Sequence, residues 1–226
     1  MTKKHDQAED SIEAVENALS RSEQFIEDNQ KIIITIVAII VGVIGIYMGY
    51  KKYYLQPMEE EAQSQMFVAA QYFERDSFNL ALKGDVNYPG FEGIIDDYSG
   101  TKAANLSKYY AGISALHLGR FEEAIDYLKG FSADDKMLKP ISLGAIGDAN
   151  MELGNKKEAA NYYMKAAQTS DNEFTAPIYL MKAGQAYELL GDNKSALEAY
   201  NTIKENYKKS AEGRIIDKYI TRAEKK

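Results

Sequence analysis

Very few side chains in this 226-residue chain are of the kinds that carry out catalysis. Cysteine is absent, which excludes disulfides, thiol nucleophiles and cysteine-ligated metal centres, and the only imidazoles are those of His5 and His117. Adjacent carboxylates point in different directions on a helix and so make poor acid–base pairs; they occur at Asp96-Asp97, Glu122-Glu123 and Asp134-Asp135. Glycine-rich phosphate loops and serine nucleophile motifs are also absent. The sequence therefore predicts a protein that is not an enzyme and holds no cofactor or metal ion.

The charge distribution narrows the class of partner. The formal net charge is −7, made of −5 over residues 1–30, −5 over residues 53–226 and three lysines beside an apolar run. Nucleic-acid binding requires clustered lysine and arginine to neutralise phosphates, so we expect no nucleic-acid partner.

A pattern of glycine and alanine recurs three times and predicts the elements that position these side chains. A glycine is followed by a second glycine seven residues later and by an alanine five residues after that, at Gly112/Gly119/Ala124, Gly147/Gly154/Ala159 and Gly184/Gly191/Ala196. The first glycine costs a helix about 1 kcal/mol relative to alanine, which indicates the close approach of a partner helix. The second glycine follows a leucine and is expected to end the helix in the left-handed conformation. Each set therefore predicts one antiparallel pair of helices.

This spacing resembles the tetratricopeptide repeat, a helical hairpin with small residues at positions 8 and 20 and an aromatic residue near position 24. Counting from Asn105, Pro140 and Pro177, the first glycines are at position 8, the alanines are at position 20, and position 24 holds Leu128, Tyr163 and Tyr200. The chain departs from the family where tryptophan is common, at Lys108, Leu143 and Leu180. The resemblance implies an all-α solenoid of stacked hairpins over residues 53–226.

The same resemblance implies a concave partner-binding groove lined by the first helix of each hairpin. The family's groove positions fall on Tyr109, Ile113, Leu116 and His117, then on Gly144, Asp148, Met151 and Glu152, then on Met181, Gln185, Glu188 and Leu189. The set is apolar with acidic edges, and its methionines suit an apolar segment or a helix. The alternative is that several of these residues only pack against neighbouring helices.

Segments outside the three hairpins show parts of the same residue pattern. Phe78 and Ala81 copy the spacing of Phe121 and Ala124, which predicts a degenerate first hairpin interrupted by a loop over residues 84–90. Similar residues precede Thr101 and Ser210, so each hydroxyl is expected to cap the helix that follows it. A last helix, to about Glu224, is expected to cover the open end of the stack.

A run without charged residues extends from Ile32 to Tyr50, between Lys31 and Lys51-Lys52. In a helix it reaches about 29 Å, close to the hydrocarbon thickness of a bilayer. We therefore expect a transmembrane helix over residues 31–52. The tail that precedes it, over residues 1–30, is expected to contain a short amphipathic helix. After the span, Pro57 is expected to break the chain. The small residues Gly42, Gly45 and Gly49 share one face, which either contacts another membrane helix or reflects only how common glycine is in such helices.

The whole layout resembles the YfgM-type family, ancillary subunits of the bacterial Sec translocon. This resemblance implies a single-pass protein of the bacterial inner membrane with a cytoplasmic N-terminus and a periplasmic repeat domain, although the flanking lysines do not decide the orientation. The implied partners are translocon subunits, a periplasmic chaperone or unfolded secreted chains. The alternative function is a structural scaffold for envelope assembly or division complexes.

Overall fold

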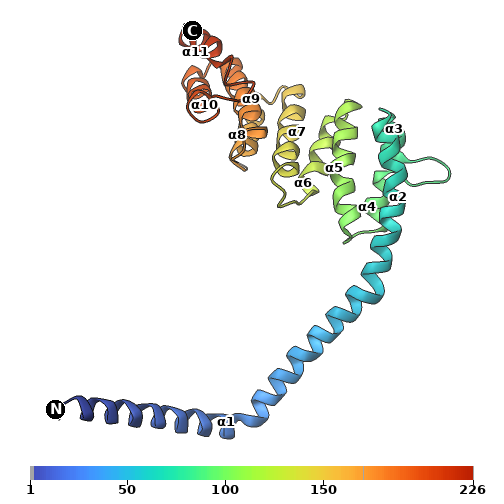
Figure 1. Ribbon diagram of the computed structural model, residues 1–226. Helices are drawn as coiled ribbons and strands as arrows, with labels where there is room; N and C mark the ends of the chain where they lie inside the picture. Colours follow the sequence, from blue (N-terminus) through green and yellow to red (C-terminus); the bar gives the residue numbers. More distant parts are fainter. Residues whose placement is uncertain (1–2, 170, 226) are drawn as a thin grey trace. The chain divides into compact units, whose positions relative to one another are not determined.

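The computed structural model describes residues 3–169 and 171–225, with side chains described at residues 25 and 26 and from residue 28 onward within those ranges. Every regular element in these residues is a helix, and their β structure is limited to an isolated bridge between Gly84 and Pro89. The chain divides into two compact units, one ending at Gln56 and the other beginning at Pro57. The all-α fold expected from the sequence is confirmed (Figure 1).

One long helix, α1 (Lys3–Tyr50), makes up most of the N-terminal unit. Most of its apolar side chains from residue 28 onward are exposed, with 60% of Ile39 and 76% of Ile46 accessible to solvent. The helical stretch from Asp28 onward contains an 18-residue window with a mean hydropathy of 2.7, none of which is buried. The helix is therefore long and apolar enough to cross a membrane. No atom lies within 4 Å of a Cβ added at Gly42, Gly45 or Gly49, so the contact face on these glycines stays a prediction.

Two details of the chain up to α2 differ from the sequence expectation. The tail forms no separate short helix, because α1 runs without interruption from residue 3. Whether this part of α1 is amphipathic stays a prediction, since most of its side chains lie outside the described ones. Pro57 does not break the chain either. It is the second residue of α2 (Gln56–Glu74), in the first turn, where a missing N–H is tolerated. The short π-helix η1 (Lys51–Leu55) precedes it, and the Gln56 amide donates to the Lys51 carbonyl.

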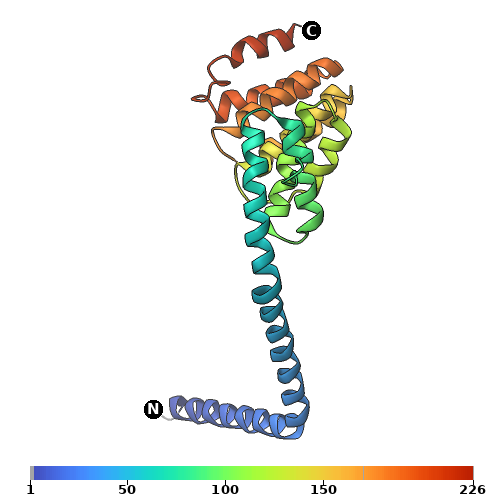
Figure 2. The same ribbon diagram turned by 90° about the vertical axis from the view of Figure 1, so that its right-hand side faces the viewer.

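Three helical hairpins and a final helix form most of the second unit (Figure 2). The hairpins are α5 (Lys102–His117) with α6 (Phe121–Gly130), α7 (Leu138–Glu152) with α8 (Lys156–Thr169), and α9 (Thr175–Leu190) with α10 (Asn193–Asn206). The final helix, α11 (Ile216–Glu224), packs on α10 and buries Ile216, Ile220 and Ala223. It covers the end of the stack, as expected.

Small residues allow the two helices of each hairpin to approach closely. A Cβ added at Gly147 would lie 2.5 Å from the ring of Tyr163, and one added at Gly184 would lie 2.2 Å from the ring of Tyr200. The residue at position 24 therefore fills the space that the glycine at position 8 leaves free. The predicted helix ends are confirmed, because Gly119, Gly154 and Gly191 have φ angles of 73°, 77° and 76°.

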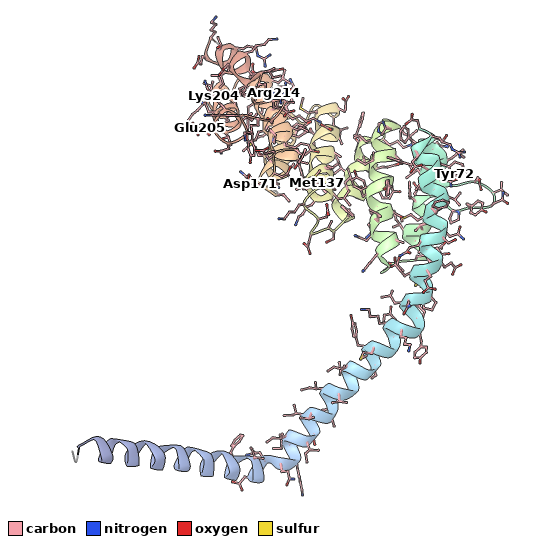
Figure 3. The ribbon with its side chains drawn as sticks, viewed as in Figure 1. Tyr72, Met137, Asp171, Lys204, Glu205 and Arg214 are labelled. Carbon is pink, nitrogen blue, oxygen red and sulfur yellow. The ribbon has the colours of Figure 1, made fainter. Side chains whose placement is uncertain are left out.

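The degenerate first hairpin is formed by α2 with α3 (Phe78–Lys83) and α4 (Phe91–Asp97). Ala81 is completely buried, and Met66 and Phe73 of α2 pack against the same core cluster. The loop over residues 84–90 separates α3 from α4, as predicted. The Asp85 carboxylate holds this loop, since it accepts the amides of Asn87 and Tyr88 and the hydroxyl of Tyr72. Tyr72 is labelled beside the loop in Figure 3.

The two predicted helix caps have different outcomes. The Thr101 hydroxyl oxygen accepts the Ala104 amide at 3.0 Å, so this cap of α5 is confirmed. The carboxylate of Glu59 in α2 accepts the two preceding amides of α5, those of Lys102 and Ala103. The expectation for Ser210 was wrong: its hydroxyl accepts the Gly213 amide within a separate turn, and α11 begins only at Ile216.

Candidate partner-binding groove

Two adjoining hollows lie along the first helices of successive hairpins and along α11. The first, of about 290 Å³, is lined by α7, α8 and α9 through Asp148, Met151, Glu152, Tyr163, Lys182, Gln185, Ala186 and Leu189. The second, of about 340 Å³, is lined by α9 and α11 through Gln185, Glu188, Leu189, Tyr219 and Arg222. Because they share Gln185 and Leu189, we refer to both together as the groove. It brings together six of the residues expected from the family positions, namely Asp148, Met151, Glu152, Gln185, Glu188 and Leu189.

The first charged cluster of the groove is centred on Asp148 of α7. Its carboxylate accepts the hydroxyl of Tyr163 from α8 at 2.6 Å and the ammonium of Lys182 from α9 at 2.7 and 2.8 Å. Tyr163 is buried, whereas the side chains of Lys182 and Asp148 are 38% and 36% exposed. The cluster links three helices, so it helps to set how one hairpin sits on the next.

The second cluster repeats this arrangement one hairpin later. Glu188 of α9 accepts the hydroxyl of Tyr200 from α10 at 2.7 Å, and the guanidinium of Arg222 from α11 donates to both of its oxygens. The Glu188 side chain is only 4% exposed. A buried carboxylate is stable only when its oxygens are paired, and this two-pronged guanidinium contact together with the tyrosine hydroxyl supplies the pairing.

The structure places the other predicted groove residues elsewhere. Tyr109, Ile113 and Leu116 pack against the buried cluster of Leu128, Ala145 and Ile146 at the junction of two hairpins. His117 is exposed and stacks on Phe78, with ring centroids 4.2 Å apart. Gly144 lies under Tyr179, and Met181 is 8% exposed within the core. These residues contribute packing in this structure.

Sequence reasoning missed Lys182, Tyr219 and Arg222. Each cation lies on the second helix after the one that carries its carboxylate, and 34 residues separate each cation from its partner. One signal was present in the sequence: Tyr163 and Tyr200 share position 24, and each bonds to a carboxylate on the first helix of its own hairpin. Among the described residues, no group of three or more His, Cys, Asp or Glu side chains is arranged to hold a metal ion.

Two segments of the chain match a known family, and they lie in the hairpins α7–α8 and α9–α10, which line the groove. The matched residues are 141–172, which cover most of α7 and all of α8, and 179–210, which cover most of α9 and all of α10. Each segment matches the tetratricopeptide repeat. A TPR repeat-containing protein of Methanocaldococcus jannaschii is 26% identical over 162 residues, which cover 70% of this chain and 26% of that protein. The chain thus spans about a quarter of the length of this curated relative. Tetratricopeptide repeats stack into extended binding surfaces, so they imply a role in protein–protein interaction.

Several tyrosines of these repeats have raised pKa values, so we expect the protein to lose stability at alkaline pH. Burial and the hydrogen bond to Asp171 raise the pKa of Tyr207 to about 12, and burial with a carboxylate neighbour also raises the pKa of Tyr163 and of Tyr200. The unfolded chain releases these protons near pH 10 while the folded chain keeps them, so each tyrosine costs about 1.4 kcal/mol of stability per pH unit above pH 10.

We expect the urea midpoint to be level from pH 8 to 9.5 and to fall between pH 10 and 12. Tyr207→Phe should make this fall less steep, because it removes one of the titrating groups. Equal slopes for Tyr207→Phe and the unaltered chain would contradict the assignment to Tyr207.

Proposed function

We propose that this chain is a membrane-anchored tetratricopeptide repeat protein that serves the Sec translocon as a YfgM-type accessory subunit and is not an enzyme. In this proposal α1 crosses the bacterial inner membrane once, the N-terminus is cytoplasmic and the repeats are periplasmic. The groove then binds a protein partner, which is a translocon subunit, an envelope chaperone or an emerging secreted chain.

The observation that carries this proposal is the groove itself. It presents Leu189, which is 56% exposed, next to Met151, Glu152 and Gln185, so apolar and polar contacts are available along α7 and α9. The exposed apolar side chains of α1 support membrane attachment, because soluble proteins rarely leave so long an apolar surface in water.

Site-specific crosslinking in intact cells tests the partner. A photoreactive residue at Gln185 or Leu189 is expected to capture translocon subunits, envelope chaperones or secreted chains. The matched control is Glu205, an exposed residue of α10 labelled in Figure 3 that does not line the groove. Recovery of cytosolic proteins alone would contradict the proposal, as would equal capture of the same partners from position 205.

Two further measurements separate this proposal from its alternatives. Protease added to spheroplasts should digest the repeats, and their protection would contradict a periplasmic location. A chaperone role predicts that the full chain in nanodiscs slows the aggregation of an unfolded protein. If it has no effect on aggregation while groove crosslinks to assembly proteins are found, the scaffold alternative is the correct one.

A further inference from the structure

The charges that line the groove are not equally available to a partner. Three carboxylates, of Asp148, Glu152 and Glu188, face two cations, of Lys182 and Arg222. The two cations are already engaged, since Lys182 donates to both oxygens of Asp148 and Arg222 donates to both oxygens of Glu188. The positive charge of each cation is therefore already offset by a carboxylate that a tyrosine hydroxyl also holds.

Glu152 differs from the other two carboxylates. It lies at the end of α7, its side chain is exposed, and no hydrogen bond or ion pair holds it among the described residues. It stands beside the apolar surface of Met151 and Leu189. After the internal pairs are counted, the groove therefore offers an apolar surface and one negative charge.

We infer that the groove selects apolar protein segments that carry a basic residue and disfavours otherwise identical acidic ones. This inference rests on the proposed function of the groove as a protein-binding site. A lysine or arginine of the partner would pair with Glu152 while apolar side chains of the partner cover Met151 and Leu189. An acidic residue at the same place would meet Glu152 as a like charge, and no free cation of the groove would offset it.

Peptide binding to the full chain in nanodiscs tests this inference. The probes are three fluorescein-labelled peptides with the same leucine-rich sequence, whose two variable positions hold lysine, glutamine or glutamate, and the readout is fluorescence anisotropy. We expect the lysine peptide to bind on the order of tenfold more tightly than the glutamate peptide, with the glutamine peptide between them. The preference should weaken as salt is raised.

Matched charge reversals locate the effect, because the net charge of −7 attracts a basic peptide to the whole surface. Glu152→Lys is expected to remove or reverse the preference for lysine, whereas Glu205→Lys makes the same change in net charge on α10 and should preserve it. Leu189→Gln, which adds no charge, should weaken the binding of all three peptides, which would show that the groove is the site.

The outcomes distinguish the inference from the proposed function. Equal binding of the three peptides, with loss of all three in Leu189→Gln, would overturn the charge selection and leave a protein-binding groove. Equal effects of Glu152→Lys and Glu205→Lys would overturn it too, because the preference would then come from overall charge. If no peptide binds and groove crosslinks are also absent in cells, the proposed function fails as well.

Discussion

Replacing Tyr200 with alanine is expected to lower the free energy of unfolding by about 3–5 kcal/mol. The Tyr200 ring is completely buried, and it fills the space over Gly184, where an added Cβ would lie 2.2 Å from the ring. Alanine would leave a cavity between α9 and α10. It would also remove the hydroxyl that donates to Glu188, whose side chain is 4% exposed. Urea unfolding of the full chain in detergent, followed by helical circular dichroism, measures the loss.

Two variants separate the contributions of the ring and the hydroxyl. Tyr200→Phe keeps the ring and should cost about 1–3 kcal/mol, the penalty for a buried acceptor that loses a donor. Tyr88→Ala removes an equally large side chain from the exposed loop between α3 and α4, where Tyr88 is 42% exposed, and should cost less than about 0.5 kcal/mol. A loss in Tyr200→Ala no greater than that in Tyr88→Ala would contradict the role of position 24 in holding the hairpin together.

The hairpins were predictable because their constraints are local in sequence. The fit between Gly184 and Tyr200 joins residues of one hairpin, and the turn at Gly191 depends on a backbone conformation that favours glycine, so fixed spacings record both. The second helix of the first hairpin was recognised in the same way from Ala81, even though a loop divides it.

The groove was only partly predictable, because its ion pairs join residues that are far apart in the sequence. Family positions indicated Asp148 and Glu188, but not that Lys182 of α9 and Arg222 of α11 neutralise them. Family positions also fail where the neighbouring hairpin covers them. Ile113 shares position 9 with Asp148, yet it packs under the next hairpin, because the cluster of Leu128 and Ile146 provides an apolar surface there. A pattern within one repeat carries no information about what the next repeat places against it.

Replacing Ile40 with aspartate is expected to disfavour membrane insertion of α1 by about 3–4 kcal/mol, the difference between these residues at the centre of a spanning helix. Ile40 lies near the middle of the run from Ile32 to Tyr50, and 52% of it is exposed. Aspartate is too short to reach the polar headgroups, so it must carry its charge into the hydrocarbon or become protonated there. We expect a shift of the insertion equilibrium on the order of a hundredfold or more, measured as the fraction of chain that resists carbonate extraction from membranes.

The control for this effect must add the same negative charge at a position outside the apolar run. Phe67 of α2 is 64% exposed within the second unit, so Phe67→Asp changes the net charge equally and should leave extraction unaltered. Ile40→Leu keeps the apolar character of the run and should also have no effect. If Ile40→Asp remains as firmly bound as the unaltered chain, the apolar run does not cross the bilayer, and the periplasmic placement of the groove loses its basis. If both aspartate variants are extracted equally, attachment depends on the repeats, and α1 is not the anchor.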